Sequence, residues 1–472
     1  MNILIKNGFI ITMDGKRRVI NKGDIYIEGN KIISVEKSGD IKPPSKPEFI
    51  IEARKKVILP GFINTHTHLP SIYVRGVYGI VSRGLYEVLF PIKTYIQPND
   101  IYLFGLASCA ESIYAGSTTI VDTYNYMNSF AKAVNETGIR AILGEQVIEA
   151  DLMKVKDGIY EYLPEQANDS LKRALNLVEN WHGKSNGRIK TIMAPLAPDM
   201  VTADTFLKCK EIAEKFKLEI TTHLSQTWQE VTQVKRIYGK TPAEHLFEIG
   251  ILDSHLSCAH CTYISDKERM LIKEKGAKIL HCPRPYAING YINPLIQPLD
   301  LGIKVGLGTD NVFHSMNETI RVALYSSRYR AKMLGGFEGM MADERPSYHE
   351  LLELATIRGA EIFGLDRELG SIEPGKKADI IAFDLSSPHL TPTIEPLSSI
   401  VLYGNSSDID LVIIDGEIVK KDGKFVRLDI GEILERAQKR AEDLWNAFFQ
   451  ENPKSSILWM QSLTQNYNKM RY

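Results

Sequence analysis

The feature that most constrains the fold is an apolar run that ends in two histidines two residues apart. Residues 57–68 read VILPGFINTHTH. Side chains on a strand alternate between its two faces, so His66 and His68 at the end of such a strand would point to the same side. Two imidazoles on one side are half of a site for zinc, iron or a related transition metal. The alternative to a metal site is that one histidine is buried and the other exposed near a turn. Which of the two interpretations holds depends on whether the rest of the chain supplies further ligands.

Apolar runs of similar length recur along the chain, with helical patterns between them. We expect eight buried strands, at residues 57–64, 118–123, 141–148, 189–196, 218–223, 256–260, 277–282 and 304–309. Segments able to place an apolar stripe inward lie at residues 104–115, 170–181, 203–215, 242–247 and 266–275. Strands that alternate with helices predict an α/β fold, a parallel (β/α)8 TIM barrel of about 250 residues. The active site of such a barrel lies at the C-terminal ends of its strands.

Both ends of the chain predict a small β-sandwich domain. Short β-branched-rich runs bounded by turn residues lie at 2–13, 23–28 and 31–35, and again at 379–384, 400–403 and 411–419. The predicted domains are a β-sandwich from residues 1–56 and 366–429, a barrel at 57–365, and a helical C-terminal extension at 430–472.

Two further segments carry predictions of their own. Residues 333–345, with several glycines and methionines, predict a mobile active-site loop, and a plain helix connection is the alternative. The tail from Asn452 onward is expected to pack on the barrel or on a second subunit.

Charge and composition restrict the partners of the protein. Lys and Arg total 57 against 58 for Asp and Glu, so the chain has no basic field for nucleic acid or an anionic membrane. No apolar stretch is long enough to span a bilayer, and the first residues read as a strand rather than a secretory signal. Five cysteines in 472 residues do not form a disulfide framework, and we interpret them as reduced thiols, mostly in the core. We therefore expect a cytoplasmic protein that acts on a small molecule. A homodimer is a separate expectation.

Polar residues stand at the ends of several predicted strands. They are His66 and His68 on the first strand, His223 on the fifth, His260 on the sixth, His281 on the seventh and Asp310 on the eighth. Any of them alone has an ordinary structural interpretation, such as a hydrogen-bonded core histidine or a turn aspartate. Three imidazoles and a carboxylate around an open position instead describe a catalytic divalent metal that keeps a water. Strand ends that converge at one barrel face favour this metal-site hypothesis.

At these residues the chain resembles the amidohydrolase superfamily, in the branch of cytosine deaminases and triazine hydrolases (chlorohydrolases). The stretches that carry the resemblance are LPGFINTHTH (59–68), AGSTT (115–119), THL (222–224), AHC (259–261), HCP (281–283), LGTD (307–310) and GSIEPGKKAD (370–379). The resemblance implies one divalent metal per chain, with zinc expected and iron or manganese as alternatives. The implied ligands are His66, His68, His223 and Asp310. Relatives with two metals bridge them by a lysine at the end of the fourth strand, whereas Lys190 stands at its beginning here.

The resemblance also implies a reaction. A metal-bound hydroxide attacks a ring carbon of a small nitrogen heterocycle, and an exocyclic amine usually leaves. Asp310 would accept the proton of the water, and His260 would hold or protonate the tetrahedral intermediate. The candidate substrate-binding residues are His260, Gln226, Arg75, Glu87, Tyr286 and Asn311.

Three departures from the family pattern affect the substrate. Deaminases usually carry a glutamate where this chain has Gln226, and an amide cannot relay a proton. Glu230 is a possible replacement, although its spacing argues against it. Leu196 stands where a substrate-binding histidine is common, and residues 284–286 (Arg-Pro-Tyr) replace the usual Ser-Asn. The pocket is therefore rebuilt, and a nucleoside substrate is not implied.

Two alternatives to deamination stay open. Gln226 favours a hydrolase of a cyclic amide, or of a compound with a non-amine leaving group, in which Asp310 is the sole acid–base residue. The other alternative is a catalytically silent family member, which the intact set of ligands disfavours.

Overall fold

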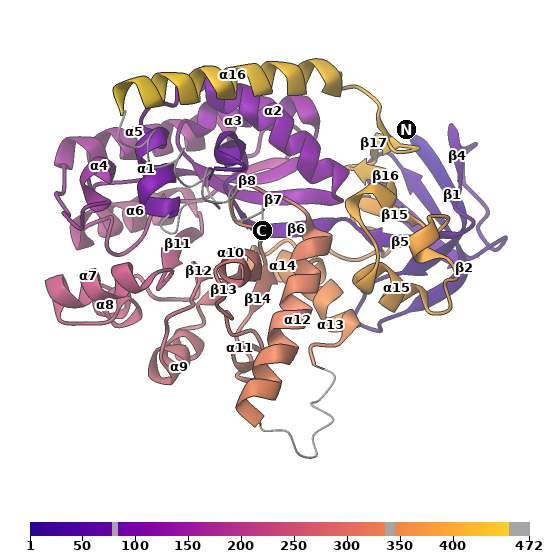
Figure 1. The fold of residues 1–472 in the computed structure, drawn as a ribbon. Coiled ribbons are helices and arrows are strands. Elements are labelled where there is room, and N and C mark those ends of the chain that lie inside the picture. The colour runs from indigo at the N-terminus through magenta and orange to yellow at the C-terminus, as the bar shows by residue number, and fades with distance from the viewer. Residues whose placement is uncertain (78–83, 336–344, 453–472) are drawn as a thin grey trace, which may run out of the picture.

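The structure, a computed structural model, describes residues 1–77, 84–335 and 345–452. Parallel strands at its centre curl into a barrel (Figure 1). These strands are β6 (Phe62–Thr67), β7 (Ser117–Tyr124), β8 (Arg140–Val147), β9 (Ile189–Thr191), β10 (Ala194–Pro195), β11 (Ile220–Leu224), β12 (Leu256–His260), β13 (Lys278–His281) and β14 (Val305–Leu307). Strands β6 to β10 form one sheet and β11 to β14 another. Parallel bridges between Thr67 and Asp310 and between Met193 and Ile220 join them at both seams, which confirms the predicted (β/α)8 barrel.

Helices follow the strands and surround them (Figure 1). They include α1 (Phe90–Lys93), α2 (Pro98–Tyr114), α3 (Met127–Thr137), α4 (Leu152–Val155), α5 (Pro164–Trp181), α6 (Ala203–Phe216), α7 (Trp228–Tyr238), α8 (Pro242–Glu248), α9 (Asp266–Lys275), α10 (Pro283–Ile288), α11 (Ile296–Asp300), α12 (Met316–Gly335), α13 (Tyr348–Leu354) and α14 (Ile357–Ile362). Local signals set their ends. Helix α9, for example, begins at a capping box between Ser265 and Glu268 and ends before Gly276, whose φ is +72°.

The two chain ends form one nine-stranded sheet beside the barrel. Its strands are β1 (Asn2–Ile11), β2 (Val19–Glu28), β3 (Lys31–Lys37), β4 (Phe49–Glu52), β5 (Lys56–Pro60), β15 (Ile380–Asp384), β16 (Ile409–Ile414), β17 (Glu417–Lys421) and β18 (Lys424–Phe425). Residues from strands at both ends of this sheet, such as Ile27 and Ile413, share a core cluster that is separate from the core of the barrel. The sheet therefore folds over its own core, as a sandwich does.

The strand predicted at residues 57–64 was wrong as a single element. Strand β5 pairs with β1 and β15 in the terminal sheet, and only β6 belongs to the barrel. The chain divides at Gly61, where a Cβ atom would lie 2.1 Å from Oγ1 of Thr118. Only glycine fits this close approach, so the backbone passes from one sheet to the other there.

Two predicted strands of the terminal sheet were also wrong. Residues 400–402 belong to helix α15 (Pro396–Leu402) and Tyr403 is its C-cap. The helix begins at Pro396 because the Glu395 carboxylate accepts hydrogen bonds from the backbone N–H groups of Leu397 and Ser398. Residues 411–419 form a hairpin of β16 and β17 rather than one strand. The reason is the turn at Asp415 and Gly416, which both have positive φ as a type I′ hairpin requires.

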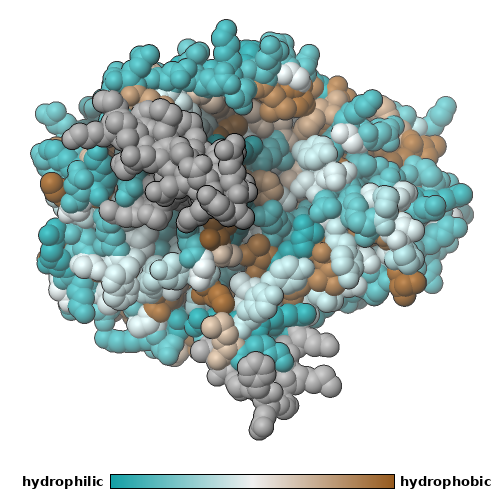
Figure 2. Space-filling view, viewed as in Figure 1, coloured by the Kyte–Doolittle hydropathy of each residue, from teal (hydrophilic) through white to brown (hydrophobic). Residues whose placement is uncertain are grey.

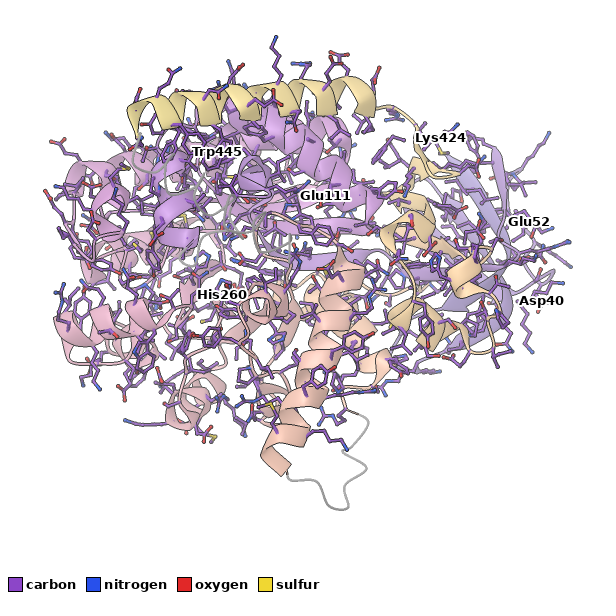
Figure 3. The ribbon with its side chains drawn as sticks, viewed as in Figure 1. Asp40, Glu52, Glu111, His260, Lys424 and Trp445 are labelled. Atoms are coloured by element: carbon purple, nitrogen blue, oxygen red, sulfur yellow. The ribbon has the colours of Figure 1, made fainter. Side chains whose placement is uncertain are left out.

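Helix α16 (Ile430–Glu451) lies across the outside of the barrel, beside α2 (Figure 1), and confirms the helix predicted after residue 430. Figure 3 shows Trp445 between this helix and the barrel. Its indole N–H donates to the carbonyl of Tyr73 over 2.7 Å. Arg440 forms a bidentate ion pair with Asp100 of α2. The tail beyond Asn452 and most of the loop predicted at 333–345 lie outside the described residues.

The rest of the molecule agrees with its composition. All five cysteines are free and buried. Within the described ranges, no helix is both long and apolar enough to cross a bilayer. Hydrophilic residues cover most of the periphery of the face drawn in Figure 2.

A buried ion pair fastens the barrel to the terminal sheet. Arg140 at the start of β8 donates two hydrogen bonds of 3.0 Å to Asp379 and one of 3.1 Å to Asp415. All three side chains are nearly buried, at 5%, 4% and 9% exposure.

We expect Arg140→Met to lower the free energy of unfolding by about 3–5 kcal/mol, because Asp379 loses its bidentate ion pair while it stays buried, and Asp415 keeps only Lys377 and Asn30 among the described residues. Arg436→Met is the control, since Arg436 pairs with Glu432 where both side chains are exposed, and it should change stability by less than about 1 kcal/mol. Chemical denaturation measures both. Equal effects of the two substitutions would contradict this role of the buried pair.

Candidate metal centre and substrate cleft

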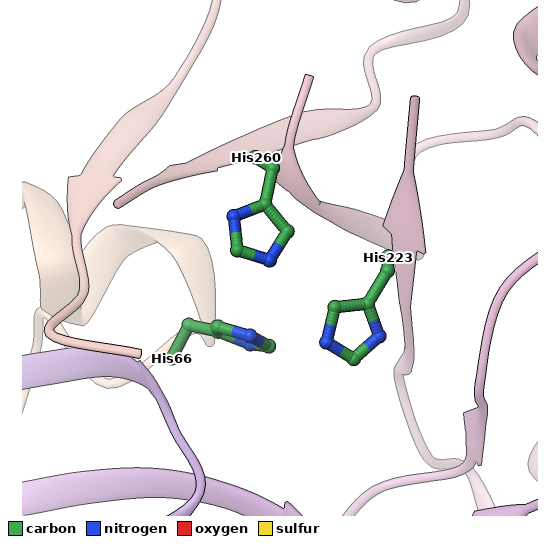
Figure 4. A group of neighbouring side chains, drawn as sticks. All are labelled: His66, His223 and His260. Carbon is green, nitrogen blue, oxygen red and sulfur yellow. The ribbon is translucent and has the colours of Figure 1, made fainter. Parts of the chain in front are cut away.

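Five of the predicted strand-end residues meet at the C-terminal end of the barrel. His66 lies on β6, His68 directly follows it, His223 lies on β11, His260 ends β12, and Asp310 follows β14. Figure 3 places His260 near the middle of the barrel. Figure 4 shows the rings of His66, His223 and His260 pointing toward one another from different strands.

The ligand atoms are close enough to share one metal ion. Nε2 of His68 lies 3.1 Å from Nε2 of His223. Oδ1 of Asp310 lies 3.4 Å from Nε2 of His68 and 3.7 Å from Nε2 of His66. Two overlapping triads have ligand atoms within 4.8 Å of one another: His66, His68 and Asp310, and His66, His223 and His260. All five side chains are buried.

The hydrogen bonds of two rings fix which nitrogen faces the centre. Nδ1 of His68 lies 2.6 Å from the carbonyl oxygen of Thr123, and Nδ1 of His223 lies 2.7 Å from that of Leu196. A carbonyl only accepts, so each Nδ1 carries the proton and each Nε2 presents a lone pair. Two lone pairs that face each other at 3.1 Å repel unless a cation lies between them, so this arrangement fits a metal ion.

Two further ligand atoms lack partners. Nε2 of His66 and Oδ1 of Asp310 are buried and accept no hydrogen bond from any described residue. Buried polar atoms are nearly always paired, so such orphans are explained by a missing ion or water. The donor set of imidazole nitrogens and a carboxylate oxygen suits zinc and similar metals.

The pKa shifts of the histidines favour the neutral state that a metal needs. Burial, together with neighbouring histidines, lowers the pKa of His66 and His68 far below the usual value. Burial lowers the pKa of His223 to about 4. These rings are therefore neutral near pH 7 and free to bind a metal. Burial raises the pKa of Asp310 to about 7, against the opposing charge of Arg284.

Backbone strain marks the same strand ends. His260 and Asp310 have φ values of +74° and +63°, a left-handed conformation that is uncommon for residues with a Cβ. Asn64 holds the segment before Asp310, because its amide donates to Oγ1 of Thr309 and accepts from the Thr309 N–H. At Gly308 a Cβ would lie 2.8 Å from Cβ of His66, so the strand passes close behind this ligand.

A cleft of about 760 Å3 opens from the centre to the surface. Of the predicted substrate-binding residues, Arg75, Gln226, Tyr286 and Asn311 line this cleft, and Asp310 lies in its wall. Glu87 is not brought to the site, because it is exposed on the π-helical turn η2 (Leu85–Leu89) and lines neither this cleft nor the inner pocket. Its neighbour Tyr86 lines both.

A smaller inner pocket of about 40 Å3 lies beside the ligands. It is lined by polar residues that include His68, Lys93, Tyr124, Gln146, Asp199, His223, Gln226 and Glu230. The sequence did not single out Lys93, Asp199, Tyr124 or Gln146. The available signal at Lys93 was a lysine that ends the otherwise apolar run of residues 88–92, but its burial depends on tertiary packing.

Glu230 lies beside Gln226 after all. Its carboxylate accepts hydrogen bonds from the N–H groups of Ser225 and Gln226, over 2.6 and 2.7 Å. Burial and the charge of Asp199 raise the pKa of Glu230. His281, by contrast, is buried near the site but belongs to neither triad of possible ligands.

Comparisons with known proteins agree with this architecture. A family model for the amidohydrolase family matches residues 57–419. The 5-methylthioadenosine/S-adenosylhomocysteine deaminase of Thermoanaerobacter pseudethanolicus is 32% identical over 448 residues, which cover 94% of this chain and 99% of the relative. The 5′-deoxyadenosine deaminase of Methanosarcina mazei is 31% identical and covers 94% and 98%.

Solved structures share the fold. An adenosine deaminase from Xanthomonas campestris with bound zinc superposes with a TM-score of 0.83 at 22% identity, covering 94% of this chain and 98% of that one. Atrazine chlorohydrolase from Arthrobacter aurescens TC1 in complex with zinc gives a TM-score of 0.83 at 24% identity, covering 93% and 100%.

The protein is a metal-dependent hydrolase that acts on carbon–nitrogen bonds other than peptide bonds. The barrel fold, the histidines at its strand ends and the named relatives together define this class. The chain belongs to the amidohydrolase family. The deaminases among its relatives favour deamination over the alternatives of a cyclic-amide hydrolase and a silent member.

We expect purified protein to contain about one divalent metal ion per chain. His223→Ala should lose most of this metal, because it removes one of the facing lone pairs. His281→Ala is the matched control, a buried barrel histidine outside the possible ligand triads, and should retain the metal. Elemental analysis measures both variants, and equal retention of metal would contradict the predicted ligand set.

Proposed function

We propose that the protein is a zinc-dependent aminohydrolase that releases ammonia from a small, neutral, amino-substituted nitrogen heterocycle. The observation that carries the proposal is the buried set of His66, His68, His223 and Asp310, with two imidazole lone pairs 3.1 Å apart. His68 and His223 line the inner pocket, and Asp310 lines the open cleft. Iron and manganese are the alternative metals. A cytoplasmic homodimer stays a prediction from the sequence.

The chemistry divides between the metal and the chain. A divalent metal held by these four residues would act as a Lewis acid and lower the pKa of a water molecule. The chain must then position the heterocycle, hold the proton of the water and deliver a proton to the leaving amine.

Asp310 is the proposed proton carrier. Its carboxyl group is buried at the centre, and burial raises its pKa to about 7. A divalent metal bound to this group would lower its pKa and favour the carboxylate form, which can accept a proton. Oδ1 lies 3.7 and 3.4 Å from Nε2 of His66 and His68, and we propose that the carboxylate also takes the proton of the attacking water.

His260 is proposed to stabilise the atom under attack. Both of its ring nitrogens are buried, and neither has a partner among the described residues. Its ring lies 5.6 Å from that of Tyr286, which lines the cleft. A substrate in the cleft beside Tyr286 would receive a hydrogen bond from His260 as charge develops on a ring nitrogen.

The charges of the cleft support a neutral substrate. Arg75 pairs with Glu111 and also donates to the carbonyl of Val312. Arg284 pairs with Glu318 over 2.7 Å and lies over the ring of Phe313. The two cations that line the cleft among the described residues are thus already paired, so neither is free to neutralise a phosphate. The relatives that act on adenosine derivatives suggest that the substrate is an adenosine-like nucleoside.

The direct test is ammonia release by the zinc-loaded protein from adenosine, its 5′-substituted derivatives, aminopyrimidines, pterins and aminotriazines. At least one of these heterocycles should be deaminated. Full zinc occupancy without ammonia release from any of them would contradict the proposed function.

We predict that His260→Asn keeps its metal and loses activity by about 10²–10³-fold, as removal of a donor to a developing negative charge does. The comparison is His223→Ala, which should lose the metal as well. Zinc content and kcat are measured on the same samples. Metal loss in His260→Asn equal to that in His223→Ala would show that His260 is itself a ligand.

Gln226 joins the two cavities, since it lines the cleft and the inner pocket. If Asp310 carries the proton, Gln226→Ala should mainly raise KM and cost far less than the about 10²–10⁴-fold in kcat that loss of an acid–base group causes. Gln226→Glu adds a group that can relay protons and should raise the rate of amine release. A collapse of kcat in Gln226→Ala at full zinc occupancy would show that the amide acts in the chemical step.

A further inference from the structure

Lys93 is a buried cation without an acidic partner. Its side chain at the end of α1 is 6% exposed. The ammonium group donates to Oε1 of Gln146 and lies 4.4 Å from the centre of the Tyr124 ring. No carboxylate oxygen among the described residues lies within 4.0 Å of it. A buried charge that is not paired costs stability, so such a residue needs another explanation.

Lys420 provides an internal comparison. It is also fully buried and lies 3.7 Å from the centre of a tyrosine ring, that of Tyr114. Its ammonium donates to two backbone carbonyls, of Tyr114 and Ile409, and so satisfies groups of the fold itself. Lys420 lines neither the cleft nor the inner pocket.

The donors of Lys93 are not used up in the same way. An ammonium group has three N–H donors, and Gln146 is the single acceptor that the described residues offer to Lys93. Gln146 is itself fixed, because its amide donates to the carbonyl of Thr123 over 3.1 Å. The other two N–H donors of Lys93 are available to a ligand, because Lys93 lines the inner pocket together with His68 and His223.

We propose that Lys93 is a substrate-binding residue. Its ammonium group donates a hydrogen bond to an oxygen on the part of the substrate that enters the inner pocket. The reacting ring then lies over His260 and Asp310, and the oxygen-bearing substituent points toward Lys93. This inference takes the kind of substrate from the proposed function. The role of Lys93 as a hydrogen-bond donor to a ligand does not depend on that function.

The lining of the pocket indicates the kind of oxygen. Asp199 and Glu230 line the same pocket as Lys93 and supply hydrogen-bond acceptors. A hydroxyl group both accepts and donates, so it matches a wall that offers an ammonium donor and carboxyl acceptors. A carboxylate of the substrate would lie beside the carboxyl groups of Asp199 and Glu230, which disfavours it, so we expect a hydroxyl. Burial lowers the pKa of Lys93 to about 7, and a bound acceptor would favour its charged form.

The test compares Lys93→Met with Lys420→Met. Adenosine is the probe, and its binding is measured by calorimetry alongside KM and kcat of the zinc-loaded enzyme. A hydrogen bond from a charged group contributes about 1.5–3 kcal/mol, so Lys93→Met should weaken adenosine binding by about 10–100-fold. Its thermal stability should be unchanged or higher, because an unpaired buried charge is removed. Its zinc content should not fall, because the substitution removes a positive charge near the ligands.

Lys420→Met should behave in the opposite way. It leaves two buried carbonyls without a donor, so its thermal stability should fall, while KM of the folded enzyme stays unchanged. This contrast separates a binding role from a structural one. A loss of stability in Lys93→Met, with equal weakening for every probe, would overturn the inference.

Deoxy analogues identify the oxygen. The effect of Lys93→Met should disappear for one of 2′-, 3′- or 5′-deoxyadenosine, and it should be absent for adenine. An effect that appears only with S-adenosylhomocysteine, which adds a carboxylate, would overturn the assignment to a hydroxyl. The inference would be overturned if Lys93→Met bound adenosine as tightly as the wild type, or if the wild type did not bind adenosine. Either result would leave deamination of another heterocycle possible. Binding that depends on Lys93 without ammonia release would instead contradict the proposed function.

Discussion

The site depends on the contact between Nε2 of His68 and Nε2 of His223, 3.1 Å apart in the interior of the barrel. Both rings donate their Nδ1 protons to backbone carbonyls, so neither can donate a proton to the other. Two lone pairs in this position are unfavourable without a cation and favourable around one. The surrounding polypeptide must therefore hold both rings against their repulsion until a metal binds.

The fold supplies that rigidity in several layers. Backbone carbonyls orient the imidazoles of His68 and His223. Asn64 within the first barrel strand is hydrogen-bonded to Thr309, which follows the eighth. The terminal sheet is fastened to the opposite end of the barrel by the buried pair of Arg140 and Asp379. Because these supports are backbone or fully paired groups, the histidines can remain neutral and unpaired at the centre.

Much of this arrangement could be predicted from the sequence, because it depends on periodicity and on strand ends. Two signals were enough to predict that His66, His68, His223 and Asp310 would meet. They are a pair of histidines two residues apart and single polar residues at the ends of later apolar runs. The rule that parallel strands of one barrel end at the same face carries that inference.

Other features could not be predicted, because they depend on contacts between distant parts of the chain. Gly61 divides an apolar run between two sheets, since Thr118 leaves no room for a Cβ. Glu230 reaches the pocket because the turn after β11 folds its carboxylate back onto the N–H of Gln226. Lys93 was overlooked because a lysine is usually exposed, and nothing local reveals that α1 buries it beside the metal centre. Glu87, six residues earlier, was among the candidate substrate-binding residues but is exposed.

The most direct test of the central claim is diffraction from zinc-loaded crystals on both sides of the zinc absorption edge. We predict one anomalous peak in the barrel, about 2.0–2.2 Å from Nε2 of His66, His68 and His223 and from a carboxylate oxygen of Asp310. A barrel without an anomalous peak, or a zinc ion bound by other residues while Nε2 of His68 and His223 remain in contact, would contradict the account.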